Sequence, residues 1–308
     1  MRRLAVACWL IPSLLVGLVG VGCDHRPVQS APATATAEAT PASVLPPAST
    51  PTGVAPTASP TATLMAPARA TVSILYDNVP WREGMQTAWG YACLVRIGET
   101  SILFDTGGDG ALLFANMAAL GVEPEAVDVV VLSHAHADHT GGLAELLASG
   151  VRPIVYIPAS FPEALKRQIA GQGHLVEING PVEVAPGVYS TGQVGSQIVE
   201  QALVVVTAEG AVVITGCAHP GVVAMVRAAQ QAVGDEIALV MGGFHLEDAT
   251  QAEIEDTIKG LRALGVQRVA PSHCTGELAQ RMFAEEFGEA CLGAGAGWEI
   301  LLELPSGD

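Results

Sequence analysis

Apolar residues recur with two periods from about residue 71 to the end of the chain, and each period predicts one kind of element. Short runs rich in β-branched residues, alternating with polar residues or continuously apolar, predict strands. These runs lie at residues 71–76, 91–97, 101–104, 127–132, 154–157, 175–178, 182–184, 188–190, 202–207, 211–215, 237–241, 266–270 and 298–304. Runs with helical apolar spacing lie at 111–120, 142–148, 162–170, 222–233, 250–264 and 277–287. Both halves of the segment mix strands and helices, which predicts two sheets sandwiched between outer helices.

The first 23 residues have a different pattern, which is typical of an export signal. Arginines at positions 2 and 3 precede an apolar run over residues 4–21, followed by Gly22 and Cys23. A basic start, an apolar run and small residues at the cut describe a secretory signal peptide. The position of Cys23 resembles the lipobox of bacterial lipoproteins, which implies cleavage before Cys23 and lipid on this residue. An ordinary signal peptide and an uncleaved anchor helix stay open as alternatives.

Residues 24–70 are rich in Ala, Pro, Thr and Ser and contain no aromatic residue. Such a segment cannot bury enough apolar surface to offset the entropy lost on ordering, and its prolines favour extended conformations. We therefore predict three parts: a lipoprotein-type signal peptide at 1–23, a disordered linker at 24–70 and a catalytic domain at 71–308. In this organisation a lipid anchor attaches the domain to the bacterial membrane outside the cytoplasm, with secretion as the alternative.

The net charge limits the class of partner that the chain can bind, and the positions of the cysteines bear on whether it contains disulfides. The chain carries 31 acidic and 14 basic residues, a formal net charge of −17 at pH 7. This charge argues against nucleic acid as a partner, because phosphate binding needs a basic face, and we expect a small-molecule substrate. Among the four cysteines of the predicted domain, Cys217 and Cys274 adjoin histidine motifs. The four therefore do not indicate a disulfide framework, and whether Cys93 and Cys291 pair is left open.

The largest cluster of candidate metal-binding residues follows the apolar run at 127–132. Within six residues the chain places His134, His136, Asp138 and His139. Imidazoles and carboxylates are suitable ligands for divalent Zn, Mn or Fe. We predict a loop at the end of a buried strand, in which His134 and His136 face one ion and Asp138 and His139 face a second about 3.5 Å away.

This run resembles the signature of the metallo-β-lactamase superfamily, which has the form His-x-His-x-Asp-His after a hydrophobic strand. The resemblance implies an αββα four-layer sandwich and a metal-dependent hydrolase with one or two ions. The segment Phe104-Asp105-Thr106-Gly107 is similar to another motif of the superfamily, in which the Asp lies beneath the metals and orients their ligands. The similarity extends along nearly all of residues 71–308.

Three further motifs each place one histidine, His219, His245 or His273, at the end of a predicted strand. In this order they resemble the subgroup named for dihydropterin ribofuranosyl-aminobenzene phosphate synthase. Most of the superfamily has an Asp that bridges both metals where this chain has Cys217. We infer that His219 completes the site of the first ion and His273 that of the second. Whether Cys217 bridges the ions, binds one of them or only packs is left open.

Three other residues are interpreted as structural or left open. Cys274 directly follows His273, and adjacent side chains at a strand end face opposite ways, so we predict a structural role for Cys274 unless the loop bends. Trp81 and Trp89 either line the mouth of the pocket or pack as ordinary aromatic residues.

Together these residues predict a hydrolase that uses two divalent metal ions and acts on a carbonyl or phosphoryl substrate. Asp138 is the expected proton acceptor, and the family resemblance gives Asp105 the orienting role. For His245 we favour protonation of the leaving group or binding of the substrate, and binding of a metal stays open. Because a fold does not name a substrate, two alternatives stay open: a transferase of the synthase type, and a surface protein with a vestigial metal site. β-Lactam hydrolysis is not expected, because the third-ligand arrangement differs.

Overall fold

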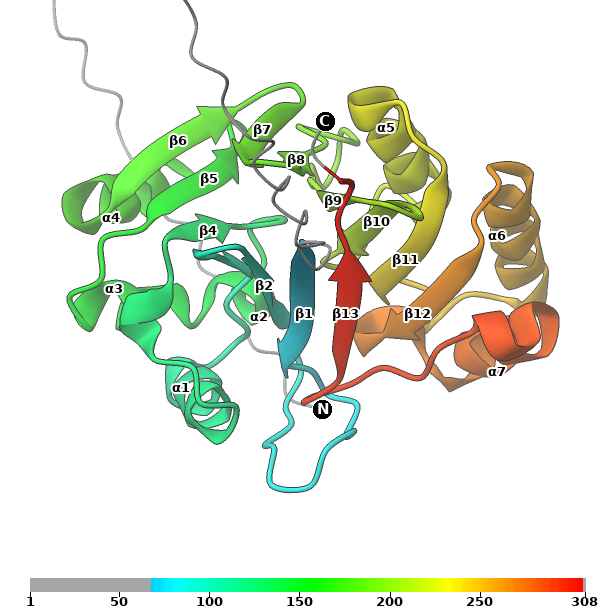
Figure 1. The fold of residues 1–308 in the computed structure, drawn as a ribbon, viewed down its shortest axis with the longest axis horizontal. Coiled ribbons are helices and arrows are strands. Elements are labelled where there is room, and N and C mark those ends of the chain that lie inside the picture. Colours follow the sequence, from blue (N-terminus) through cyan, green and yellow to red (C-terminus); the bar gives the residue numbers. More distant parts are fainter. Residues whose placement is uncertain (1–67, 307–308) are drawn as a thin grey trace, which may run out of the picture. The chain divides into compact units, whose positions relative to one another are not determined.

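The computed structural model of the chain describes residues 68–306. The predicted signal peptide at 1–23, with Cys23, and the predicted linker as far as residue 67 lie outside the described residues. Two sheets face each other and helices cover their outer faces (Figure 1). The predicted αββα sandwich is confirmed. No helix within residues 68–306 is long and apolar enough to cross a membrane.

The first sheet has seven strands in the order β13–β1–β2–β3–β4–β5–β6. Its strands are β1 (Arg69–Tyr76), β2 (Ala92–Ile97), β3 (Thr100–Phe104), β4 (Val129–Val131), β5 (Ile154–Pro158), β6 (His174–Ile178) and β13 (Glu299–Glu303). The helices of this half are α1 (Gly110–Ala119), α2 (Ala137–Thr140), α3 (Leu143–Ala148) and α4 (Glu163–Gln172). Leu113 of α1 and Leu146 of α3 share a buried cluster with Leu103 of β3, so these helices cover the outer face of the sheet.

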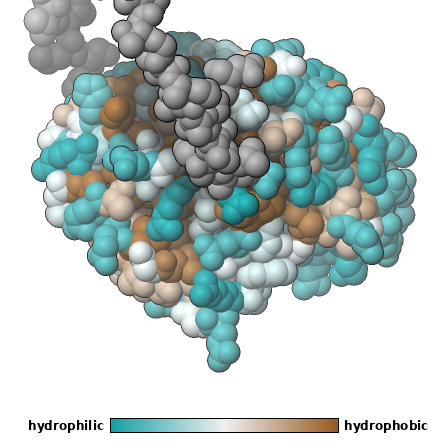
Figure 2. All heavy atoms as spheres, viewed as in Figure 1, coloured by the Kyte–Doolittle hydropathy of each residue, from teal (hydrophilic) through white to brown (hydrophobic). Residues whose placement is uncertain are grey.

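The second sheet has six strands in the order β12–β11–β10–β9–β8–β7. Its strands are β7 (Val182–Ala185), β8 (Val188–Ser190), β9 (Leu203–Thr207), β10 (Gly210–Thr215), β11 (Ile237–Gly243) and β12 (Arg268–Ser272). Its helices are α5 (Val222–Val233), α6 (Gln251–Ala263) and α7 (Glu277–Phe287). Helix α6 buries Ile254, Ile258 and Leu261 on one stripe, as an amphipathic surface helix does. Figure 2 shows hydrophilic residues gathered along the side of the molecule where α6 and α7 lie.

The central core lies between the two sheets. Val72 and Val95 from the first sheet and Val205 and Val212 from the second belong to one buried cluster. Successive side chains of a strand point to opposite faces of the sheet, so the neighbouring Val204 packs on the helical side instead. A strand that is buried on both faces needs apolar residues at every position, which explains the continuous apolar runs.

Two strands take places that the local pattern did not predict. The run at 175–178 forms β6 at one edge of the first sheet. Strand β13 returns to the first sheet and pairs antiparallel with β1. In the second sheet β10, β11 and β12 are parallel neighbours, so their carboxyl ends meet at one edge. The histidine motifs follow these ends, which brings them to a common place.

Candidate metal centre

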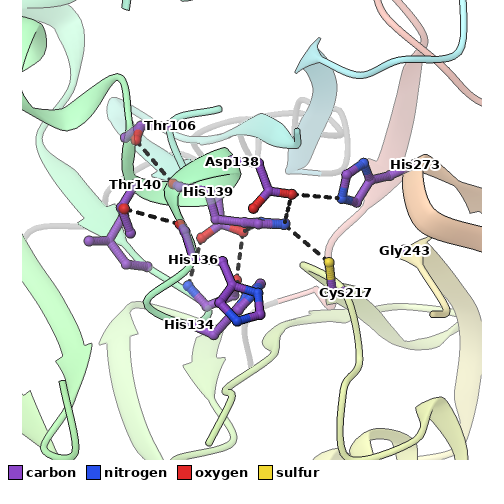
Figure 3. Close-up of polar contacts among 12 residues, drawn as sticks. Thr106, His134, His136, Asp138, His139, Thr140, Cys217, Gly243 and His273 are labelled. Atoms are coloured by element: carbon purple, nitrogen blue, oxygen red, sulfur yellow. Dashed lines mark hydrogen bonds and ion pairs between the residues drawn. The ribbon is translucent and has the colours of Figure 1, made fainter. Parts of the chain in front are cut away.

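The histidine run begins where β4 ends and continues into a short helix (Figure 3). Helix α2 starts at Ala137, so Asp138 and His139 lie in a helical turn and not in the predicted loop. The backbone N–H groups of His139 and Thr140 each donate to the carbonyl oxygen of His136 at 3.1 Å. These bonds close the turn, which holds Asp138 and His139 at fixed positions.

Buried oxygen acceptors fix the outer nitrogens of two histidines. Asp105 Oδ2 lies 2.7 Å from His139 Nδ1 and accepts a hydrogen bond from Ser133 Oγ, also at 2.7 Å. Ser133 Oγ lies 2.9 Å from His134 Nδ1. Since the hydroxyl proton of Ser133 points to Asp105, His134 Nδ1 donates to the hydroxyl oxygen. Both rings therefore turn Nε2 inward, as second-shell partners of metal-binding histidines do.

The inward nitrogens of His134 and His219 face each other. Their Nε2 atoms are 3.2 Å apart, a distance at which the pair can share at most one proton. Burial, followed by the neighbouring imidazoles, lowers the pKa of His134 far below its usual range. Burial also lowers the pKa of His219 to about 4, with His245 as the next cause. Both rings are therefore neutral near pH 7, which is the protonation state that binds metal.

Negative charge gathers at His139. Its Nε2 lies 3.2 Å from Cys217 Sγ and 3.4 Å from Asp138 Oδ2. Burial would lower the pKa of His139, but the charges and hydrogen bonds of Asp105 and Asp138 raise it to about 10. Two carboxylates beside one buried imidazole require a positive charge here, and either a proton or a metal cation can supply it.

His273 provides the clearest sign of an absent partner. Asn78 Nδ2 donates to the His273 carbonyl oxygen at 3.2 Å, which turns Asn78 Oδ1 toward His273 Nδ1 at 2.9 Å. His273 Nε2 is buried and has no hydrogen-bond partner, and its distance to Asp138 Oδ2 is 3.6 Å. A buried nitrogen without a partner is costly. A divalent cation fits this nitrogen and the His, Asp and Cys donors around it.

Six of the seven predicted ligands fall into two groups. Within each group, the ligand atoms all lie within 4.8 Å of one another. The first group contains Asp138, His139, Cys217 and His273, and the second contains His134, Cys217 and His219. His136 is in neither group; it is exposed, and its ring centroid lies 4.6 Å from that of His134 and 4.7 Å from that of His219. The assignment of these residues as ligands stays a prediction.

The sequence is similar to proteins of known family over much of its length. Residues 90–222 match the model of the metallo-beta-lactamase superfamily. The chain is 31% identical over 234 residues to the 7,8-dihydropterin-6-methyl-4-(beta-D-ribofuranosyl)-aminobenzene-5'-phosphate synthase of Methanocaldococcus jannaschii, covering 61% of this chain and 80% of that protein. The chain belongs to the metallo-beta-lactamase superfamily.

A solved structure from the same superfamily has the same fold. It is described as a metal-dependent hydrolase of the beta-lactamase superfamily, and it is 28% identical to this chain with a TM-score of 0.64. The match covers 76% of this chain and 99% of that one. Members of the superfamily usually bind divalent metals, and the two groups of His, Asp and Cys residues are suited to hold them.

The Cys274 side chain does not point away from the candidate metal centre. The chain bends at His273 (φ 48°) into the turn His273–Thr275, which is the exception under which Cys274 was not expected to point away. Cys274 Sγ instead lies within 4.8 Å of the ligand atoms of Cys217 and His245. All four cysteines of the described residues, including Cys93 and Cys291, are free thiols.

Glu200 is a functional candidate that the sequence did not reveal. This fully buried carboxylate accepts backbone hydrogen bonds from Cys217 and Ala218 on Oε1, at 2.9 and 2.8 Å, and from His219 on Oε2 at 2.9 Å. It therefore holds the turn that carries two predicted superfamily ligands. Glu200 lies in no motif, and no sequence signal marks it.

A pocket of about 500 Å³ opens beside the metal centre, and Trp89, His245, Glu247 and Asp248 line it. The Trp89 ring lies 4.9 Å from that of His273. Trp81, in contrast, lines a different pocket. The ring of exposed His245 lies 4.1 Å from that of His219, and the neighbouring Cys274 sulfur raises the pKa of His245. His245 thus stands between the predicted ligands and the pocket.

Proposed function

We propose that this superfamily member is a metal-dependent hydrolase that uses two divalent ions to direct water onto a carbonyl or phosphoryl centre. The observation that carries the proposal is the buried His273 Nε2, which lacks a hydrogen-bond partner and faces the Asp138 carboxylate. Divalent cations bound there supply the charge that acidifies water and polarises a substrate oxygen.

We assign the orientation of the attacking water to Asp138 and the protonation of the leaving group to His245. Burial would raise the pKa of Asp138, but the imidazoles of His139 and His273, at 3.4 and 3.6 Å from Asp138 Oδ2, hold it far below its usual range. The ionised Asp138 is half-buried, so it can accept a hydrogen bond from the attacking water and orient it. His245 lies on the pocket side, where it can donate a proton to the leaving group.

The pocket favours a carbonyl substrate over an anionic phosphodiester. Its volume of about 500 Å³ suits a small molecule. Glu247 and Asp248 line it, and their charge repels a phosphate ester. Trp89 offers an apolar ring beside His273. We therefore rank lactones and thioesters above phosphodiesters.

The purified full chain, supplied with Mn, Zn, Fe or Co, should be assayed against lactones, thioesters and phosphodiesters. We expect metal-dependent hydrolysis, and we expect His136→Ala and His273→Ala each to lose activity and bound metal, by mass spectrometry, with an unchanged circular dichroism spectrum. His174→Ala is the matched control, because this exposed histidine lies in β6 and in none of the histidine motifs. Full activity in a metal-depleted His273→Ala contradicts the proposal, and a wild-type chain that takes up no metal favours the vestigial alternative.

The identity to the Methanocaldococcus jannaschii synthase supports a second candidate, a transferase that joins a pterin to a phosphorylated aryl riboside. Our proposed location outside the cytoplasm counts against it, because such intermediates belong to the cytoplasm. A pterin-condensation assay with several metals separates the two activities, and the absence of product rejects the transferase.

Attachment of the chain to the outer side of the cytoplasmic membrane through lipid on Cys23 is also part of our proposal. Its support is the basic and apolar pattern before Cys23. Cys23→Ser should move the protein from the membrane fraction to the soluble fraction of expressing bacteria, whereas Cys8→Ser should not. Unchanged fractionation of Cys23→Ser contradicts a lipid anchor.

A further inference from the structure

A third group of ligand atoms adjoins the metal centre. Cys217 Sγ, Cys274 Sγ and a ring nitrogen of His245 lie within 4.8 Å of one another. Both thiols are almost completely buried, while His245 is exposed. Cys274 belongs to neither of the two groups described above. The sulfurs of Cys217 and Cys274 therefore lie together, and the imidazole of His245, which lines the pocket, lies beside them.

The three residues of this group follow three neighbouring parallel strands. Cys217 follows β10, His245 follows β11 and Cys274 follows β12, and the strands pair side by side in that order. Gly243 leaves space for the sulfur, because a Cβ at this position would lie 2.7 Å from Cys274 Sγ. His245 and His273 both have left-handed backbone, with φ of 53° and 48°. Such conformations cost free energy in residues other than glycine and tend to persist at functional sites.

The donor atoms indicate the kind of ligand. Thiolate is a soft ligand and imidazole a borderline one, and together they suit zinc-like cations better than oxygen-seeking ones. Glu247 and Asp248 line the adjoining pocket, and their charges raise the local concentration of cations. We propose that Cys217, His245 and Cys274 form a further binding site for a thiophilic divalent cation such as Zn²⁺ or Cd²⁺. Both sulfurs bind as thiolates, so every proton that they still carry is released to solvent when the cation binds.

This thiol-rich site shares Cys217 with the two groups of the metal centre. A cation held by Cys274 and His245 therefore competes for the sulfur that lies 3.2 Å from His139 Nε2. The inference does not depend on hydrolysis, because it concerns metal binding alone and is tested by metal binding alone.

Cobalt and cadmium report sulfur ligation directly. We expect Co²⁺ added to the reduced wild-type chain to give sulfur-to-cobalt charge-transfer absorption, and Cys274→Ser to remove about half of it, because one of two soft ligands is lost. Cd²⁺ affinity, measured by competition with a chelating dye, should fall by about tenfold or more. Cys291→Ser is the matched control, because this half-buried thiol lies outside the group and should titrate like the wild type.

Cadmium NMR of the wild-type chain covers the case in which Cys274→Ser fails to fold. A chemical shift typical of two sulfur ligands supports the site, and a shift typical of one sulfur or none overturns it. Unchanged cobalt absorption and cadmium affinity in folded Cys274→Ser overturn it as well. His134→Ala separates this site from the proposed hydrolase, because the two-sulfur cadmium signal should persist in that variant even where metal at the second group is lost.

Discussion

Oxygen acceptors behind the metal centre decide which ring nitrogen faces inward. Asp105 accepts hydrogen bonds from the Ser133 backbone N–H at 2.6 Å and the Ser133 hydroxyl at 2.7 Å, and it holds His139 Nδ1 at 2.7 Å. Asn78 Oδ1 does the same for His273 Nδ1. A ring that donates from Nδ1 presents the lone pair of Nε2, so these acceptors prepare the ligands for metal.

Asn78→Ala should weaken metal binding although it removes none of the predicted ligands. Without the Asn78 oxygen the His273 ring loses its fixed tautomer and orientation, and we expect metal affinity to fall about 10- to 100-fold. Chelator competition measures this change. Asn179→Ala is the control, because the Asn179 side chain is exposed and bonds only to Gln193. Wild-type affinity in Asn78→Ala would show that the Asn78 contact does not position His273.

The histidines and Asp105 could be identified because they stand in short motifs, whereas Asn78 and Glu200, which hold His273 and the Cys217 turn, were missed. Asn78 is separated from His273 by 195 residues, and Glu200 from Cys217 by 17. Such contacts depend on how strands from distant parts of the chain meet. The direction of Cys274 was not predictable for a local reason, since the left-handed backbone at His273 interrupts the alternation of side chains.

Helix α6 begins with a capping box that should contribute measurably to stability. Thr250 Oγ1 accepts from the Glu253 backbone N–H, and the Glu253 carboxylate accepts from the Thr250 backbone N–H. Thr250→Ala should lower the free energy of unfolding by about 1 kcal/mol, measured by urea denaturation. Thr257→Ala in the same helix is the control, since its hydroxyl bonds only the Glu253 carbonyl oxygen and its loss should be close to neutral. Equal losses in both variants would exclude capping as the cause.

Helix α7 supports the strand end that carries His245. Phe283 is fully buried and its ring lies 5.3 Å from that of Phe244, the residue before His245. Phe283→Ala should lower the free energy of unfolding by about 3–5 kcal/mol, because it leaves a cavity in the core. Leu278→Ala, at an exposed position of the same helix, should change it by less than about 0.5 kcal/mol. A small loss in Phe283→Ala would mean that the site collapses around the cavity.

Most helices and strands were predictable because each carries its own apolar period. Helix α5 has the predicted bounds, and so does α7. The places of β6 and β13 in the first sheet were not predictable, because both are edge strands whose partners are set by the tertiary fold. Helix α2 was missed because four residues are too short to show a period.

At the scale of the whole domain, the candidate ligands come from both sheets. His134, Asp138 and His139 follow β4 of the first sheet, and Cys217 and His273 follow strands of the second. A bound ion therefore joins the two sheets as a cross-link.

Removal of metal should lower the melting temperature of the protein. Ions present at a thousand times their dissociation constant stabilise the folded state by about 4 kcal/mol, which corresponds to about 10 °C in a domain of this size. Calorimetry with and without a chelator measures the shift, and His273→Ala should show a smaller one. An unchanged melting temperature on chelation would mean that the ligands do not link the sheets.

Between residues 68 and 306, four residues other than glycine have left-handed backbone: Asp105, Ala218, His245 and His273. Each such residue costs about 1–2 kcal/mol relative to an ordinary conformation, so the domain gives up stability where its candidate chemistry lies. Laboratory evolution for heat resistance alone should therefore introduce glycine or asparagine at these positions and erase the site. Evolution under joint selection for turnover and heat resistance should accept glycine at Ala218, where no side-chain chemistry is lost, and reject it at the other three.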